Sequence, residues 1–205
     1  NECWDNASPH FEFEKTKKNI EEFNASNKLY KKGVAIMPIC FGISFTNTLM
    51  NQARALVHVY TDGSVVVSTA AIEMGQGVNT KILQVVAQTF SISPDKVRVN
   101  STNTYRIANT SPSAASATAD LNGKATLIAC ETILQRIKSV AATEFKVEET
   151  AIELKDEFVY ANGIKTEWDW KKIVLTTYNK RVSLSEHSHY STPDIHFDKT
   201  KEKGH

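Results

Sequence analysis

The feature that most constrains the fold is a hairpin signal that leads into a glycine-rich turn. The β-branched runs Ala55 to Tyr60 and Val65 to Thr69 flank Thr61-Asp62-Gly63-Ser64. Asp-Gly between two such runs is the strongest short-range signal for a β-hairpin. The second run leads into Gly75-Gln76-Gly77, and a helical pattern follows. This order of hairpin, turn and helix predicts a fold that mixes a sheet with helices.

The turn at Gly75-Gln76-Gly77 is a candidate ligand site. Neither glycine has a Cβ, so the backbone can turn sharply and approach a ligand closely. A helix start offers unpaired N–H groups to an anionic or carbonyl-rich ligand, and the Gln76 amide both donates and accepts. The alternative is an ordinary strand-to-helix turn. A phosphate P-loop is excluded because the Gly-Lys-Ser/Thr element is missing. Four apolar residues at helical spacing predict a helix that runs to about Phe90: Val78, Ile82, Val85 and Val86.

A second candidate site precedes a long helix. Val97 to Val99 reads as a short strand, and Ser111 to Ala119 contains almost only small residues. A low-complexity linker is one interpretation of that composition. A long helical pattern follows directly, which argues against a linker. Small side chains ahead of a helix would instead let backbone amides and hydroxyl groups lie close to a bulky ligand. The apolar side of that helix is predicted to comprise Leu121, Ala125, Leu127, Ile128, Leu134 and Ile137.

The first predicted helix is interpreted as scaffold. Ser8-Pro9 is a sound helix start, and Gly33 is the predicted end of that helix. Val34 to Thr46 is almost wholly apolar, as a buried strand would be, with a bend expected at Pro38 and Gly42. Judged alone, Phe45 within this run is a core residue.

The last third predicts a second hairpin, a short helix and a strand. Glu157 to Tyr160 and Ile164 to Thr166 flank Ala161-Asn162-Gly163. Thr166 resembles the first residue of a capping box before the helix, and Val182 to Tyr190 alternates like a strand. His58, His187 and His189 are interpreted as structural or surface residues, since no third metal ligand is evident.

Composition narrows the class of protein. The chain has 205 residues and a formal charge of +1, which argues against nucleic acid or an anionic membrane as the main partner. Cys3, Cys40 and Cys130 are widely spaced and lack CxxC, so we expect reduced thiols and a cytoplasmic protein without a membrane span. A first residue other than Met and an abrupt end at His205 suggest a fragment of a longer chain.

These patterns predict an α+β fold (an α/β two-layer arrangement) with a mixed sheet and helices packed on one face. The hairpin and the 97–99 strand should share that sheet, covered by the helices that follow Gly77 and Ser116. Residues 1–150 would form the core that carries the two turns, and residues 151–205 a smaller extension. Two function classes stay open at this point: a cofactor-binding piece of an enzyme, and a non-catalytic interaction or assembly module.

Several motifs resemble the molybdopterin-binding region of the xanthine oxidase/aldehyde oxidase family. They are Phe41 to Thr46, Leu56 to Val65, Glu73 to Gly77 and Asn109 to Ser116, and they occur in the order of the family. The similarity continues through Cys130 to Leu134, Val182 to Ser185 and Thr192-Pro193. The resemblance thus covers nearly all of the chain, which is a minority of the molybdenum-binding region of the family.

The resemblance implies a molybdenum hydroxylase that oxidises xanthine or hypoxanthine with oxygen derived from water. Its cofactor would be molybdopterin, with or without a cytosine dinucleotide, and electrons would pass through Fe–S clusters and FAD in partner domains or subunits to NAD. The full enzyme would be a dimer. Aldehydes or other N-heterocycles are the alternative substrates.

Site residues follow from the same resemblance. Gly75, Gln76 and Gly77 match the cofactor-binding turn, and Ala115 and Ser116 match the Ala-Ser pair near metal and pterin. Thr118-Ala119 stands where the family has Ser-Thr, a departure that implies a difference in one hydrogen bond to the pterin, with Thr118 still among the residues expected to bind it. Two further residues, Phe45 and Thr46, match the Phe-Thr pair of the purine pocket, which favours purines over aldehydes. The resemblance implies no protein ligand to the metal, and it places the catalytic glutamate outside this chain, so the fragment alone should be inactive.

Overall fold

The computed structural model describes residues 2–39, 41–100 and 102–204. The chain forms two compact units, Asn1–Gly42 and Ile43–His205. The predicted boundary at residue 150 remains a prediction. One strand beyond it, β7 (Ser185–Ser191), belongs to the main sheet of the second unit.

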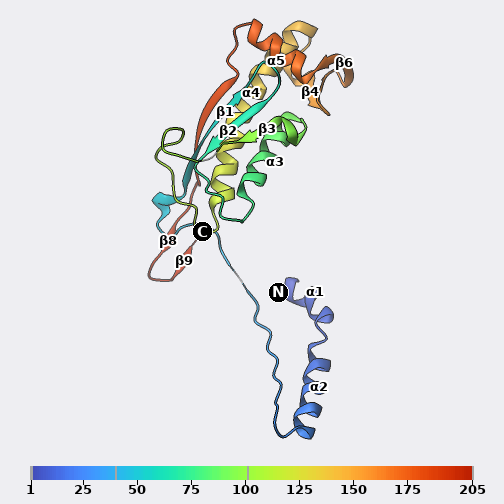
Figure 1. The fold of residues 1–205 in the computed structure, drawn as a ribbon, viewed down its shortest axis with the longest axis vertical. Helices are drawn as coiled ribbons and strands as arrows, with labels where there is room; N and C mark the ends of the chain where they lie inside the picture. The colour runs from blue at the N-terminus through green and yellow to red at the C-terminus, as the bar shows by residue number, and fades with distance from the viewer. Residues whose placement is uncertain (1, 40, 101, 205) are drawn as a thin grey trace. The chain divides into compact units, whose positions relative to one another are not determined.

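The second unit is built on a mixed sheet with the strand order β3-β2-β1-β7 (Figure 1). The long strand β1 (Gln52–Val59) pairs antiparallel with β2 (Val65–Thr69) on one side and with β7 on the other. The short strand β3 (Val97–Val99) runs parallel to β2. The predicted hairpin at Asp62-Gly63 and the predicted 97–99 strand are confirmed as neighbours in one sheet.

Two helices cover one face of this sheet. Helix α3 (Val78–Phe90) and helix α4 (Thr118–Phe145) pack against each other and against the strands. Every second residue of β1 is buried, as expected for a strand with one face on a core. The predicted α+β fold, with helices on one face of a mixed sheet, is confirmed. The core residues of β1 and β2 are Ala53, Ala55, Val57, Val59, Val65 and Val67.

A smaller sheet follows α4 and ends in a short helix. Its strands are β4 (Ile152–Lys155), β5 (Phe158–Ala161) and β6 (Ile164–Asp169), in the order β4-β5-β6, and α5 spans Trp170–Asn179. The predicted hairpin around Asn162 is confirmed. The predicted cap is wrong: Asp169 accepts a hydrogen bond from the Lys172 N–H at 2.7 Å, so it caps α5. Thr166 cannot do so because β6 continues three residues beyond it.

The smaller sheet is fastened to the main one by Trp170. This side chain is fully buried, lies 5.2 Å from the Phe90 ring between ring centroids, and donates from Nε1 to the Gly63 carbonyl at 2.7 Å. The hairpin turn must therefore approach the indole closely. Gly63 has a φ of +89°, and a Cβ there would lie 3.1 Å from Trp170 Cδ1. Gly63 is thus needed twice, for the positive φ of the turn and for the close packing of Trp170 between the sheets.

Glu157 makes a second attachment between the sheets. Its carboxylate accepts from the Ser93 N–H at 2.8 Å and pairs with Lys96 Nζ at 2.7 Å. Its own backbone N–H donates to the Ser91 carbonyl at 2.9 Å. The ion pair with Lys96, followed by the Ser93 bond, lowers the pKa of Glu157 below its usual 4.5.

Replacing Glu157 by Gln is expected to destabilise the chain at neutral pH and to matter less in acid. A carboxyl with a lowered pKa contributes stability that is full above the unfolded pKa and is lost as the pH falls through the folded pKa. Urea unfolding of wild type and Glu157→Gln, repeated from neutral pH to below about pH 3, should therefore show two curves that converge. Asp95→Asn, an exposed neighbour, is the matched control. A wild-type advantage that grows in acid would contradict this assignment.

The first unit contains α1 (Glu2–Ala7), a 3₁₀ turn (Ser8–His10) and α2 (Phe13–Ser26). The predicted helix from Ser8 to Gly33 is wrong at both ends, since α2 starts and stops inside it. Asn27 explains the early stop: its Oδ1 accepts from the N–H groups of Leu29 and Tyr30 at 3.1 and 3.0 Å. Such a local side-chain acceptor competes with helix continuation.

The predicted buried strand from Val34 to Thr46 is also wrong for this chain. Among residues 34–39 and 41–46 there is no strand, and three of the large apolar side chains face solvent: Met37, Ile39 and Phe41, at 83%, 86% and 74% exposure. A strand needs a neighbour for its N–H and C=O groups, and no described residue supplies one along 34–39 and 41–43. Cys40 lies outside the described residues.

The remaining elements are short. They are the 3₁₀ turns Thr48–Met50, Pro94–Lys96 and Glu149–Ala151, and the two-residue strands β8 (Phe197–Asp198) and β9 (Lys203–Gly204). Of the cysteines, Cys3 is exposed, whereas Cys130 is buried in α4, where burial raises its pKa to about 12. Within the described residues, none of the helices combines the length and the hydropathy needed to span a bilayer.

Candidate functional site

Three stretches predicted to carry site residues meet before α4. The Ile72 N–H, beside the glycine turn, donates to Ser113 Oγ at 2.8 Å. The Ser44 N–H, next to Phe45, donates to the Ala115 carbonyl at 3.0 Å. The segment around residues 113–115 therefore holds both the 72–77 turn and the Phe45-Thr46 pair.

The glycine turn has the geometry that only glycine adopts readily. Gly75 has a φ of +100° and Gly77 a φ of +74°, and a Cβ built on either would meet nothing within 4 Å. The space beside both backbones is therefore open, while any side chain there would strain the turn. Both residues, with Gln76 between them, lie on the surface ahead of α3.

The N–H groups at the start of α3 are not available as predicted. One Glu73 carboxylate oxygen accepts from Gly75 and Gly77 N–H, both at 2.9 Å, and the other from Asn79 N–H at 3.0 Å. These bonds, Asn79 first, lower the pKa of Glu73. The chain's own carboxylate thus takes the place expected for an anionic ligand, which agrees with a structural role for Glu73.

The Gln76 side chain braces its own turn. Its Oε1 accepts from the Met74 N–H at 2.6 Å, and its Nε2 donates to the Ile72 carbonyl at 2.8 Å. Ile72 is also the residue bonded to Ser113, so two hydrogen bonds link Gln76 through Ile72 to the second candidate segment. The residue remains exposed, and a ligand can reach its amide from the solvent side.

The small-residue segment is held in a rare backbone conformation. Ala115 and Ser116 both have a φ of +53°, which is uncommon for residues other than Gly, Asn and Asp. Their backbone N–H groups donate to no other residue in the described part of the chain. Thr118 is the first residue of α4 and is half-buried. The segment thus presents two unused donors at the start of a long helix.

Phe45 is clamped by a buried asparagine. The Phe45 N–H donates to Asn51 Oδ1 at 2.8 Å, and Asn51 Nδ2 donates to the Phe45 carbonyl at 2.9 Å. The Phe45 ring is half-buried, whereas Thr46 is exposed. The ring packs against a small cluster formed by Ala53, Ala55, Ala117, Leu121 and Ala125. The aromatic face is therefore fixed next to the start of α4.

Sequence reasoning missed Asn51 and Ser113. Asn51 is only 2% exposed, and a polar residue directly before an alternating strand was the available signal. Ser113 lies in the small-residue segment, but nothing in its neighbourhood indicates a bond to a residue 41 positions away. Both side chains bond backbone groups of other segments, Asn51 6 residues back and Ser113 41 residues away, and a local pattern does not record such bonds.

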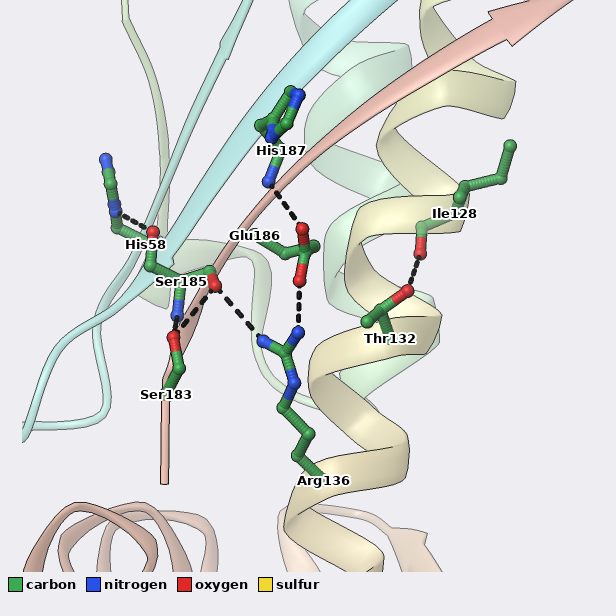
Figure 2. A network of polar contacts seen from close by, with 8 residues as sticks. All are labelled: His58, Ile128, Thr132, Arg136, Ser183, Ser185, Glu186 and His187. Carbon is green, nitrogen blue, oxygen red and sulfur yellow. Dashed lines mark hydrogen bonds and ion pairs between the residues drawn. The ribbon is translucent and has the colours of Figure 1, made fainter. Parts of the chain in front are cut away.

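A polar network between α4 and β7 is structural. Figure 2 shows Arg136 of α4 reaching β7, where it pairs with the Glu186 carboxylate and donates to the Ser185 carbonyl at 3.2 Å. His58 Nδ1 lies 2.7 Å from Ser185 Oγ, which confirms His58 as a satisfied structural residue. The described residues contain no group of three or more His, Cys, Asp and Glu side chains able to hold a metal.

The candidate site fits a large ligand with many hydrogen-bonding atoms. The open faces of Gly75 and Gly77 allow close approach. The Gln76 amide and the N–H groups of Ala115 and Ser116 supply donors and an acceptor from two distant parts of the chain. The Glu73 carboxylate already accepts from backbone N–H groups. Such a site suits a large cofactor that the protein binds and orients.

Comparisons with known proteins identify the family. Residues 6–205 match the family model of the molybdopterin cofactor-binding domain. The chain is 39% identical over 202 residues to the xanthine dehydrogenase/oxidase of Gallus gallus, covering 98% of this chain and 13% of that protein. It is 40% identical over 203 residues to xanthine dehydrogenase 1 of Arabidopsis thaliana, covering 99% and 13% respectively.

The fold agrees with that of a solved enzyme. The aldehyde oxidoreductase from Desulfovibrio desulfuricans superimposes with a TM-score of 0.64 at 16% identity, over 99% of this chain and 19% of that one. The chain spans about 13% of the length of the curated relatives named above. Sequence, family model and fold thus agree on one conclusion: the chain belongs to the molybdopterin cofactor-binding domain family.

Proposed function

We propose that this chain is part of a molybdenum hydroxylase that oxidises xanthine or hypoxanthine with oxygen derived from water. The observation that carries the proposal is the meeting of the Gln76 turn and the Phe45 stretch at residues 113–115. The identity of 39–40% to enzymes named xanthine dehydrogenase supports it. In the full enzyme, which we propose to be a cytoplasmic dimer, electrons pass through Fe–S clusters and FAD to NAD.

The residues of this chain would hold and orient the molybdopterin. Gln76 lies beside two open glycine faces and offers its amide to the cofactor next to the metal. The N–H groups of Ala115 and Ser116 and the Thr118 hydroxyl would bind the pterin from the start of α4. When bound, the cofactor supplies the redox-active molybdenum.

The substrate would be recognised by Phe45 and Thr46. Phe45 presents one rigid aromatic ring, held by both Asn51 bonds, to a planar purine, and the exposed Thr46 hydroxyl gives a polar contact. Aromatic pairs contribute about 0.5–1.5 kcal/mol beyond the burial of their area. The base is a glutamate outside this chain, so the 205-residue fragment alone should not turn over xanthine.

Replacing Phe45 by Leu in the full enzyme is expected to lower kcat/KM for xanthine about 10-fold, as the loss of about 1.4 kcal/mol of ring contact predicts. Leucine keeps the contact with Ala117 and Leu121, so molybdenum content should stay near wild type. Tyr178→Leu, an exposed aromatic change on α5, is the control. Equal losses of metal and turnover would show that Phe45 acts through folding instead.

Two other functions remain to be separated by the same assay. An aldehyde or another N-heterocycle as substrate would be revealed by a higher kcat/KM for an aromatic aldehyde than for xanthine in the intact enzyme, which would overturn the Phe45-Thr46 assignment. A non-catalytic cofactor-binding or assembly module would bind molybdopterin and oxidise neither compound. Molybdenum analysis of the same sample distinguishes these outcomes.

A further inference from the structure

The apolar stretch 34–43 lacks the environment that its sequence demands. Its β-branched and aliphatic residues predict a buried strand, yet Met37 and Ile39 are more than four-fifths exposed. The unit Asn1–Gly42 has no buried side chain among its described residues, so it has no core of its own into which the stretch could fold. An exposed apolar surface of this kind marks an interaction site.

The backbone of the stretch is equally unsatisfied. Across residues 34–39 and 41–43, the N–H and C=O groups have no hydrogen-bond partner within the described chain. The chain is anchored immediately afterwards, where the Ser44 N–H donates to the Ala115 carbonyl. An extended apolar segment with free backbone groups is suited to pairing with the edge of a sheet, where main-chain bonds give affinity and alternate side chains fill pockets.

We propose that residues 34–39 add as a strand to an open sheet edge supplied by the polypeptide outside this chain in the full enzyme. That polypeptide is the larger part of the protein, because the chain spans only about 13% of its relatives. Pairing would fix the segment that leads into Phe45 and Thr46. The inference does not depend on the identity of the substrate.

Pro38 determines which side of the strand is paired. Proline has no N–H to donate to a ladder, so the strand edge toward which the Pro38 backbone groups point must face away from the partner strand. The N–H and C=O of one residue point to the same side of a strand, and neighbours point to opposite sides. Ala35, Met37 and Ile39 therefore bond the partner, whereas Val34, Ile36 and Pro38 form the outer edge.

Residue-resolved hydrogen exchange on the full-length enzyme tests this alternation. We expect the amides of Ala35, Met37 and Ile39 to exchange roughly 100-fold more slowly than those of Val34 and Ile36, because only the former are in a ladder. Uniformly fast exchange over the whole stretch would overturn the proposal. Uniform protection without alternation would overturn it too, since it indicates simple burial.

A matched pair of proline variants gives an independent readout. Ala35→Pro removes an N–H from the paired side, and Ile36→Pro removes one from the outer side. We expect Ala35→Pro to reduce the yield of molybdenum-loaded enzyme by at least about 10-fold and Ile36→Pro by less than about 2-fold. Ile36→Pro removes a larger side chain than Ala35→Pro does. If side-chain packing alone decided the outcome, Ile36→Pro would therefore have the larger effect. Equal or reversed effects contradict the proposal, and if neither variant folds, the exchange pattern of the wild type decides.

Discussion

Replacing Gln76 by Ala in the full enzyme is expected to lower molybdenum content or the activity per molybdenum by about 10- to 100-fold, the range observed when a residue that supports a metal centre is removed. The change removes the amide that we propose binds the cofactor. It also frees the Met74 N–H and the Ile72 carbonyl that the side chain now holds. Metal analysis and xanthine turnover on the same purified sample measure both effects.

Gln84→Ala is the matched control for Gln76. It is an exposed glutamine on α3, a short distance along the chain, and we expect wild-type metal content and turnover. Gln76→Glu adds a second comparison, because it keeps an acceptor for the Met74 N–H but loses the donor to Ile72. Full activity of Gln76→Ala would remove Gln76 from the cofactor site.

Trp170→Ala is expected to destabilise the 205-residue chain by about 3–5 kcal/mol, the usual cost of truncating a buried aromatic residue to alanine. The side chain is fully buried, contacts Phe90 and donates to the Gly63 carbonyl. Its loss leaves a cavity between the two sheets and a hairpin carbonyl without its donor. Urea unfolding followed by far-UV circular dichroism measures the change in the free energy of unfolding.

Trp168→Ala separates this effect from the loss of any tryptophan. Trp168 is half-buried against Phe145, 5.0 Å between ring centroids, so its truncation should cost clearly less. Trp170→Phe retains most of the packing but not the Nε1 bond, and we expect an intermediate loss of about 1–2 kcal/mol. A loss below about 1 kcal/mol for Trp170→Ala would mean that the smaller sheet is not fastened through this residue.

Local signals predicted most elements of the second unit. The Asp62-Gly63 hairpin, the helix after Gly77, the helix after Ala117 and the Asn162-Gly163 hairpin are confirmed. Each is encoded within a few residues, by turn chemistry or by apolar periodicity, and such signals persist whatever surrounds them. The boundaries were less predictable, because Asn27 and Asp169 act as local acceptors that shift a helix end or a helix start.

Two other unmet expectations share one cause. Val34 to Thr46 has the composition of a buried strand, but composition does not provide the neighbouring strand that a ladder requires. The helix start at α3 offers N–H groups in principle, but Glu73 folds back from only a few residues away and accepts from them. In both cases the sequence shows which hydrogen bonds a segment can make. Which of these bonds form depends on the donors and acceptors that the folded chain brings within reach.

The sequence by itself determined the secondary structure of the sheet-and-helix unit and, through its resemblance to a family, the residues expected to bind molybdopterin. Tertiary structure alone decided that Ile72 bonds Ser113, that Ser44 bonds Ala115 and that Asn51 holds Phe45. The first two contacts join groups far apart in the chain, and the third joins the Asn51 side chain to a backbone group 6 residues earlier. Their existence depends on how the sheet and α4 pack, because a bond of this kind follows no period in the sequence and is fixed only once the packed layers bring donor and acceptor within about 3 Å.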